Sequence, residues 1–279
     1  MAFRDLHQPG RPLLLPNVWE FGVGALLAAQ GFPALGTTSL GVSAAAGEPD
    51  GHPRTLDATI ALALSLSTVD AFVTVDIADG FSADPGAVAD LASVLAEAGA
   101  AGVNIEDGRA DGSLAGVDAQ CTLIAAMKAR VPDLFVNART DTNWLRTGPV
   151  SAAISRVKAY AGVGADGVFV PGLADAGDIE AVVRAVEVPV NVLFSPGGHP
   201  VAQLAELGVA RISLGSLPYR MALAAAVETV SAVRDGRPLP LTPPSYSEVT
   251  ALLPRSQSSE LASGACMHSA RISTFLRDT

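Results

Sequence analysis

Short apolar runs alternate with longer helical patterns eight times along most of this chain. The runs are continuous and rich in β-branched residues, which is typical of strands buried on both faces. The expected strands span residues 13–16, 34–37, 72–76, 102–106, 135–139, 167–170, 190–193 and 211–214. The expected helices span residues 18–30, 55–68, 85–98, 118–130, 150–162, 175–186, 200–207 and 216–234.

This alternation predicts a parallel sheet, and eight strand–helix units favour a closed (β/α)₈ TIM barrel over residues 1–236. Asp84 followed by Pro85 is typical of a helix start, since aspartate caps free N–H groups and proline suits the first turn. A doubly wound open sheet is the alternative. It is disfavoured because no glycine-rich phosphate-binding fingerprint follows the first expected strand.

The alternation stops near Pro238, so residues 237–279 are expected to form a C-terminal extension. Four prolines at 238, 240, 243 and 244 form a connector. Residues 246–253 are expected to form a short helix, and the serine-rich segment 256–263 is expected to be flexible.

Composition narrows the class of protein. The 279 residues suffice for one barrel, and 49% hydrophobic against 16% charged residues argues against general disorder. A net charge of −10 argues against a nucleic-acid partner, and no apolar stretch is long enough for a membrane span.

Cys121 and Cys266 form no metal or redox motif. Two free thiols and no signal-peptide pattern predict a cytoplasmic protein.

Three charged residues stand at the ends of neighbouring expected strands. Asp76 ends the third strand, Glu106 the fourth and Arg139 the fifth. Adjacent parallel strands lie about 4.8 Å apart, so the two carboxylates could converge on one Mg²⁺. Arg139 suits a bidentate carboxylate ligand. The structural alternatives are helix capping by the acids and an ion pair of Arg139 with Glu106 or Asp141.

Five motifs fall where expected strands give way to loops. They are Pro16-Asn17-Val18-Trp19-Glu20, Thr37-Thr38-Ser39-Leu40, Val75-Asp76-Ile77-Ala78-Asp79-Gly80-Phe81, Asn104-Ile105-Glu106-Asp107 and Asn137-Ala138-Arg139-Thr140-Asp141. In this order they resemble the isocitrate lyase/phosphoenolpyruvate mutase superfamily, and its phosphoenolpyruvate mutase-like subgroup in particular. The resemblance covers residues 3–236. Superfamily members cleave or rearrange bonds next to the carboxylate of a small oxo- or hydroxy-acid.

The resemblance implies roles for individual residues. Arg139, Asp50 and Glu106 would be catalytic, with Asp50 on a mobile loop that closes over the site. Asp76 and Glu106 would hold Mg²⁺, and Asp76 and Arg139 would also contact the substrate. Thr38, Ser39 and Leu40 would cradle the substrate carboxylate. Asn191, within the seventh strand, would bind substrate if it faces the mouth and would otherwise face a neighbour. A homo-oligomer, dimer or tetramer, is expected.

Departures from the family pattern narrow the chemistry. Ala78 replaces a family carboxylate, which weakens the expected Mg²⁺ site. Pro171 stands where the family usually has Glu or His. The lyase loop Lys-Lys-Cys-Gly-His is absent from residues 107–114, which argues against an isocitrate or methylisocitrate lyase. His199 in its Gly-Gly-His-Pro loop is either a proton donor at the mouth or an exposed turn residue, and Arg220 either matches a lyase arginine or lies on a helix surface.

The sequence therefore predicts a lyase that acts on a small α-oxo or α-hydroxy carboxylate through an enolate-like state. Carbon–carbon cleavage or decarboxylation of an oxaloacetate-like acid is the first expectation. One alternative is carbon–phosphorus chemistry of the phosphoenolpyruvate mutase or phosphonopyruvate hydrolase type. The other is a non-catalytic relative that binds a small carboxylate.

Overall fold

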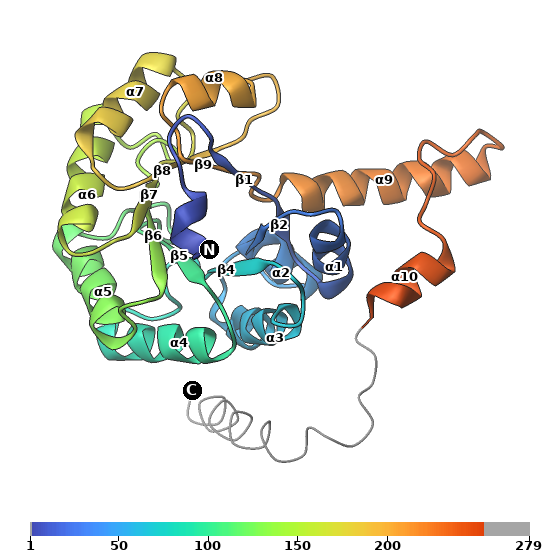
Figure 1. Cartoon of the computed structure of the whole chain (residues 1–279), viewed down its shortest axis with the longest axis horizontal. Helices are drawn as coiled ribbons and strands as arrows, with labels where there is room; N and C mark the ends of the chain where they lie inside the picture. The colour runs from blue at the N-terminus through green and yellow to red at the C-terminus, as the bar shows by residue number, and fades with distance from the viewer. Residues whose placement is uncertain (1, 254–279) are drawn as a thin grey trace, which may run out of the picture.

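A parallel sheet forms the centre of the protein in the computed structural model, which describes residues 2–253 (Figure 1). Its strands are β1 (Leu13–Leu15), β2 (Asn17–Val18), β3 (Ala34–Thr37), β4 (Phe72–Asp76), β5 (Gly102–Glu106), β6 (Phe135–Arg139), β7 (Gly167–Phe169), β8 (Val190–Leu193) and β9 (Arg211–Ser213). They pair in the order β1-β9-β8-β7-β6-β5-β4-β3-β2, all in parallel. The predicted TIM-type barrel is confirmed.

The expected strand over residues 13–16 forms β1, and Pro16 divides it from a second short strand, β2, which was not expected. β1 pairs with β9 and β2 pairs with β3, so the chain itself joins the two ends of the sheet. Proline lacks the N–H that a strand ladder needs. The carbonyl of Pro16 still accepts the N–H of Gly36 at 2.9 Å, so the chain remains hydrogen-bonded to β3 at this point.

Helices surround the barrel in the expected places. They are α1 (Phe21–Ala29), α3 (Leu56–Leu66), α4 (Pro85–Glu97), α5 (Val117–Arg130), α6 (Val150–Gly162), α7 (Ala176–Ala185), α8 (Val201–Glu206) and α9 (Leu217–Arg234). Asp84 caps α4 by accepting the N–H groups of Gly86 and Ala87, as its sequence pattern predicts. The short helix α2 (Ser39–Ala45) was not expected. It follows β3 directly, and no helical periodicity can develop over seven residues.

The N-terminal segment closes one end of the barrel. The 3₁₀ helix η1 (Phe3–Leu6) buries Phe3 against Phe72 and Phe135, which begin β4 and β6. His7 stacks on Phe135 with 4.5 Å between ring centroids. Burial, aided by the charge of Arg211, lowers the pKa of His7 to about 4. The other end of the barrel, where the strands finish, remains available for chemistry.

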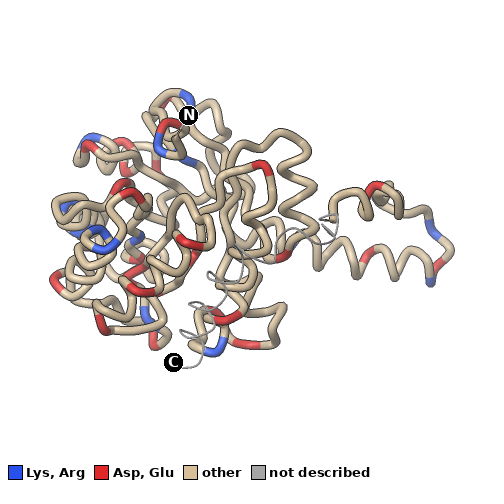
Figure 2. The backbone as a smooth tube through the Cα atoms, turned by 60° about the horizontal axis from the view of Figure 1, so that its bottom comes forward, with Lys and Arg blue, Asp and Glu red and all other residues tan. Residues whose placement is uncertain are grey.

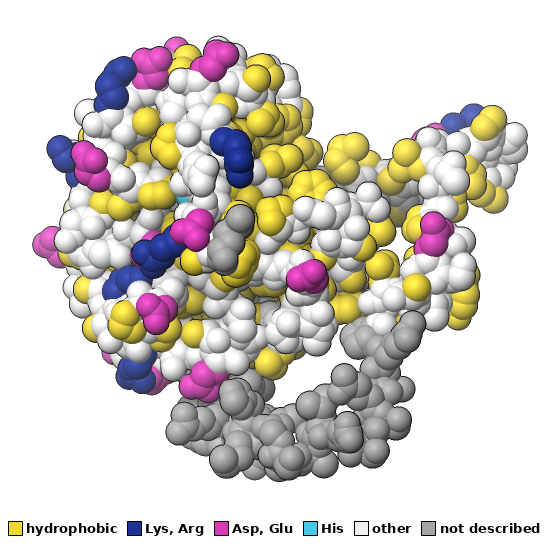
Figure 3. Space-filling view, in the orientation of Figure 1, with side chains coloured by type: hydrophobic (Ala, Val, Ile, Leu, Met, Phe, Trp, Pro, Cys, Tyr) yellow, Lys and Arg dark blue, Asp and Glu magenta, His cyan; other side chains and the backbone are white. Residues whose placement is uncertain are grey.

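Helix α9 projects from the barrel, and the chain then turns back so that α10 (Tyr246–Leu252) contacts α1; we define residues 217–253 as the arm (Figures 1 and 2). Only Ala232 of α9 is buried. The large apolar side chains exposed on α9 are Met221, Leu223, Val227, Val230 and Val233. Figure 3 shows hydrophobic side chains along this arm. The expected short helix near residue 246 is confirmed as α10.

The serine-rich segment 256–263 and Cys266 lie outside the described residues. Cys121 is half-buried, with a free thiol. Within residues 2–253, no helix combines the length and apolar character needed to cross a membrane.

Candidate active site

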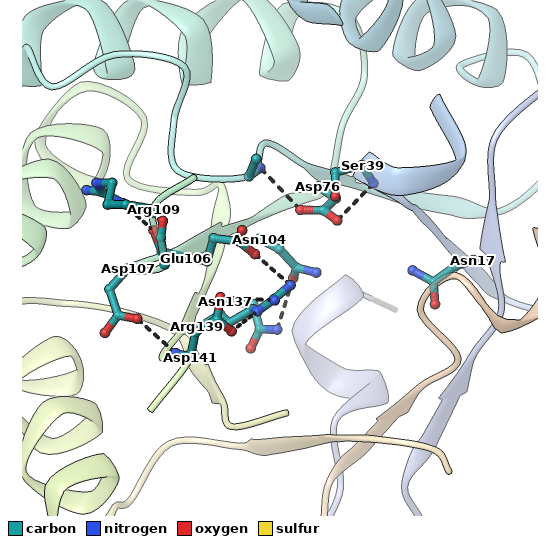
Figure 4. A network of polar contacts seen from close by, with 12 residues as sticks. Asn17, Ser39, Asp76, Asn104, Glu106, Asp107, Arg109, Asn137, Arg139 and Asp141 are labelled. Carbon is teal, nitrogen blue, oxygen red and sulfur yellow. Dashed lines mark hydrogen bonds and ion pairs between the residues drawn. The ribbon is translucent and has the colours of Figure 1, made fainter. Parts of the chain in front are cut away.

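Arg139 is the centre of a charged cluster where the barrel strands end (Figure 4). It lies opposite Glu106 in the β5–β6 register. Its Nη1 atom is 2.6 Å from Glu106 Oε2. Its Nε and Nη2 atoms donate to the two carboxylate oxygens of Asp141, at 2.6 and 3.1 Å. Two acidic residues thus fix the plane of one guanidinium, and both ion pairs named as structural alternatives are present.

The protonation state of Glu106 reflects its burial. Burial raises the pKa of Glu106 to about 8, although the charge of Arg139 works in the opposite direction. The contact with Arg139 is close but lacks hydrogen-bond alignment, and Glu106 Oε2 accepts no hydrogen bond from any residue that the structure describes. The charges of Asp141, Asp76 and Asp50 add to the upward shift. At Arg139, the charges of Glu106, Asp141 and Asp76 outweigh desolvation and raise the pKa of the guanidinium, so Arg139 remains charged.

Asp76 is held in place by backbone groups. Its Oδ2 atom accepts the N–H of Ser39 at 3.1 Å, and its Oδ1 atom accepts the N–H of Ala78 at 3.2 Å. In the β4–β5 register Asp76 lies opposite Asn104, two residues before Glu106. Asp76 and Glu106 were expected to lie side by side at the ends of their strands. In the structure they are offset by two residues along the strand pair. The stagger of strands around a barrel causes this offset.

The neighbouring acid Asp107 has a different role from Glu106. Asp107 is fully buried, and its Oδ1 atom accepts the N–H of Asp141 at 2.8 Å. Its Oδ2 atom accepts the hydroxyl of Tyr160 at 2.6 Å and Nη1 of Arg156 at 3.0 Å. This network attaches the loop after β5 to α6 and fixes Asp141, which in turn orients Arg139. Sequence reading missed the network, because partners 34 to 53 residues apart leave no local pattern.

Two adjoining cavities open onto the charged cluster. One of about 130 Å³ is lined by Asn17, Thr38, Ser39, Leu40, Asp50, Asp76, Asn104, Arg139, Trp144, Phe169, Pro171, Leu193, Ser213, Gly215 and Ser216. The other, of about 200 Å³, is lined by Asp50, Gly51, Ala78, Asp79, Glu106, Gly108, Arg109, Ala110, Arg139, Asp141, Trp144 and Leu145. Asp50, Arg139 and Trp144 belong to both, so the cavities meet at the guanidinium. We call them the inner and outer cavity.

Most of the predicted site residues share these walls. Thr38, Ser39 and Leu40 line the inner cavity together with Asp50, Asp76 and Arg139, and Glu106 lines the outer one. Asn191 lines neither cavity. It is buried next to the inner cavity, where its Nδ2 atom donates to Ser213 Oγ at 3.0 Å. Asn191 thus faces a neighbouring strand, one of the two orientations considered from sequence.

Three other residues named from sequence lie in different settings. Pro171 lines the inner cavity. The ring of His199 contacts Gln203 and the carbonyl of Ala174, and it lines neither cavity. Arg220 is exposed on α9.

The loop that carries Asp50 packs over Ala78. Gly47 and Gly51 have φ angles of 73° and 66°, which glycine adopts without strain. A Cβ atom at Gly51 would lie 3.3 Å from the Cβ of Ala78. Burial raises the pKa of Asp50, and the charge of Asp76 adds to this shift. The small side chain at position 78 therefore leaves room for the loop that carries Asp50.

Within residues 2–253, no group of three or more His, Cys, Asp or Glu side chains is arranged to hold a metal ion. Asp76 and Glu106 therefore do not belong to an all-protein metal cage. The cluster nevertheless places four acidic residues around one guanidinium: Asp50, Asp76, Glu106 and Asp141. This surplus of carboxyl groups over cationic groups suits a divalent cation. Mg²⁺ commonly binds through one or two carboxylates, with water and substrate oxygens completing its shell. The donor set fits that mode of binding.

The phosphoenolpyruvate phosphomutase family model matches residues 3–234. An uncharacterized protein of Mycobacterium tuberculosis is 45% identical over 254 residues, which cover 91% of this chain and 96% of that protein. A candidate lyase/mutase of Burkholderia cenocepacia has a solved structure that is 36% identical, with a TM-score of 0.81 over 90% of this chain and 93% of that one. Oxaloacetate decarboxylase of Pseudomonas fluorescens is 32% identical over 152 residues, about half of each chain.

The family match covers the whole barrel, and the barrel presents the charged motifs at one end. The relatives include oxaloacetate decarboxylase, a probable 2-methylisocitrate lyase and 2,3-dimethylmalate lyase, so the comparisons support an enzyme. The chain belongs to the isocitrate lyase/phosphoenolpyruvate mutase superfamily.

Proposed function

We propose that this protein is a carbon–carbon lyase or decarboxylase that acts on a small 2-oxo or 2-hydroxy carboxylate through an enolate-like intermediate. The observation that carries the proposal is the meeting of Arg139 and Asp50 at the junction of the two cavities. One is a permanently charged guanidinium, and the other is a carboxyl group whose pKa is raised. The partial match to oxaloacetate decarboxylase favours the same reaction class.

Each residue then has a defined task. Arg139 holds an oxygen of the substrate and stabilises the negative charge that develops there when the adjacent carbon–carbon bond breaks. Asp50, in its protonated form, donates a proton to the carbon of the enolate. The backbone around Thr38, Ser39 and Leu40 would bind the substrate carboxylate. Closure of the Asp50 loop would exclude water.

Mg²⁺ is part of the proposal, held by Asp76 directly or through water, with Glu106 as the second acidic residue. When bound, such an ion would polarise the oxo group of the substrate. Phosphonopyruvate hydrolase, which shares the fold at 24% identity and a TM-score of 0.78, was solved with oxalate and Mg²⁺. Oxalate is a planar dianion that resembles the enolate of pyruvate, so it is a suitable probe.

The decisive experiment is calorimetric titration of oxalate, with and without Mg²⁺, followed by a turnover assay with oxaloacetate and related acids. We expect oxalate to bind more tightly in the presence of Mg²⁺, and oxaloacetate to release carbon dioxide or a smaller acid. Absence of oxalate binding under both conditions would reject the proposed function.

Two alternatives make different predictions in the same assay. An enzyme of carbon–phosphorus chemistry would convert phosphonopyruvate and leave oxaloacetate intact. This alternative is considered because a candidate phosphonomutase of Burkholderia cenocepacia is 38% identical to this chain. A carboxylate-binding relative without turnover would bind oxalate and convert neither acid. Ala78 and Pro171, which replace family polar residues, motivate this second alternative.

We also propose that the protein acts as a homo-oligomer, dimer or tetramer, in the cytoplasm. The exposed apolar side chains of α9 support association, because contiguous apolar surface on a projecting helix is costly in water. A second copy of the same arm would cover this surface.

A further inference from the structure

Arg211 is a buried cation with no carboxylate at ion-pair distance among the described residues, although the charge of Asp76 acts on it and opposes the lowering of its pKa. It begins β9, is 1% exposed and forms no ion pair among residues 2–253. Its Nη1 atom has no hydrogen-bond partner in the described part of the chain. Burial lowers the pKa of its guanidinium to about 9. A buried, unpaired guanidinium destabilises a fold, so its presence inside the barrel calls for a functional explanation.

The contacts of Arg211 lead to the floor of the inner cavity. Its Nε atom donates to Ser213 Oγ at 3.1 Å, and its Nη2 atom donates to Asn104 Oδ1 at 3.3 Å. Both acceptor residues line the inner cavity, whereas Arg211 does not. Arg211 and Ser213 are two residues apart on one strand, so their side chains share its inward face. Arg211 therefore lies one layer beneath the cavity floor.

These contacts decide which atoms the floor presents. Ser213 Oγ also accepts Nδ2 of Asn191, so two N–H donors occupy its lone pairs and its hydroxyl proton is left without an acceptor among the described residues. Asn104 Oδ1 accepts both Arg211 and Asn137, the latter at 2.9 Å, which leaves its Nδ2 group as a donor. A hydroxyl donor and an amide donor on a cavity wall suit a carboxylate oxygen.

We propose that Arg211 is a positioning residue of an anion-binding floor formed by Ser213 Oγ–H and Asn104 Nδ2–H, which receives a carboxylate of the substrate. Arg211 orients both donors and adds positive charge from below. Such charge is needed because Arg139 is already shared between Glu106 and Asp141, and Asp76 and Asp50 also face the ligand. This inference rests on the proposed binding of a small carboxylate and identifies the inner cavity floor as one of its binding surfaces.

The test compares the Arg211→Met and Arg211→Lys variants with the wild type by calorimetric titration of oxalate and of oxamate, which carries one negative charge fewer. Arg211→Met should weaken oxalate binding about tenfold or more, an effect of ~1.4 kcal/mol, and weaken oxamate binding less. Arg211→Lys should restore part of the affinity. The melting temperature of Arg211→Met should equal or exceed that of the wild type, because it removes an unpaired buried charge.

A second pair of variants keeps the test independent of folding. Ser213→Ala and Asn104→Ala should each weaken oxalate binding, and Ser213→Ala should weaken it less in the Arg211→Met background than in the wild type. Unchanged oxalate affinity in folded Arg211→Met, or in both floor variants, would overturn the anion-binding floor. Failure of the wild-type protein to bind oxalate would instead reject the proposed function itself.

Discussion

Arg139 and Asp141 form a two-bond ion pair in which Nε and Nη2 of the arginine meet separate carboxylate oxygens. Asp141 is itself fixed through its N–H by Asp107. The guanidinium is therefore oriented before any ligand arrives. The buried Asp107 holds Asp141, and Asp141 holds Arg139. Such a fixed guanidinium can stabilise developing charge without rearranging.

The first prediction concerns the shape of this cation. Arg139→Lys should weaken oxalate binding at least about tenfold although the charge is kept, because an ammonium group cannot reproduce two parallel hydrogen bonds. Calorimetry measures the effect. The matched control is Arg130→Lys, where the arginine pairs with Asp90 on the exposed surface at 2.6 Å. Wild-type affinity in Arg139→Lys would argue against the assigned pocket.

The second prediction concerns the missing family carboxylate. Ala78 has a φ of 49°, a conformation that Asp and Asn tolerate better than most residues. Ala78→Asp should tighten Mg²⁺ binding and weaken oxalate binding in the absence of Mg²⁺, because like charges would face each other in a buried site. Ala78→Asn provides the uncharged control of nearly equal size. Titrations in which neither form of the protein takes up Mg²⁺ would favour metal-free chemistry.

The third prediction is a pH dependence of stability that originates at the closed end of the barrel. The pKa of His7 is about 4 in the folded protein and about 6.5 in an unfolded chain. Between these values the unfolded state binds the additional proton, so stability is present above pH 6.5 and lost as pH falls toward 4. The loss amounts to about 3 kcal/mol.

Urea unfolding at pH 7 and pH 4, compared between the wild type and His7→Phe, isolates this contribution from other acid effects. The difference in unfolding free energy between the two proteins should shift by about 3 kcal/mol in favour of His7→Phe at the lower pH. A constant difference would show that His7 titrates normally.

The fourth prediction tests the role of the arm. Val227→Asp combined with Val230→Asp should reduce the proposed oligomer to a monomer, because charges would be buried in an apolar contact. Light scattering coupled to size-exclusion chromatography gives the mass. Ser155→Asp, on an exposed position of α6, serves as the control. If the wild-type protein is itself a monomer, the proposed association of the arms is wrong.

The barrel could be predicted from sequence because its strands and helices carry local signals. Continuous apolar runs located β3 to β6 with the bounds that the structure has. Helix α2 and the division at Pro16 escaped because each involves too few residues for a period to develop. The charged residues Asp76, Glu106 and Arg139 could be placed at strand ends for the same reason, because each follows an apolar run.

Apart from the ion pairs of Arg139 with Glu106 and Asp141, which were among the alternatives considered, the supporting contacts of the site could not be predicted. The two-residue offset between Asp76 and Glu106 depends on the stagger of the whole barrel, which no segment encodes by itself. Arg211 occurs in a short strand with nothing nearby to suggest that its partners are Asn104 and Ser213. The Tyr160 hydroxyl and Asp107 meet only because α6 packs beside β6 and β7, next to the loop that follows β5.

The attachment of Asp107 to Tyr160 and Arg156 gives the two sides of the cavities unequal freedom to evolve. On one side, a substitution at Asp107, Tyr160 or Arg156 would disturb Asp141 and hence the orientation of Arg139. On the other side, the Asp50 loop packs on Ala78 and begins and ends at glycines. New substrate preferences can therefore arise by changes in that loop, while the charged side preserves the geometry on which the proposed enolate chemistry depends.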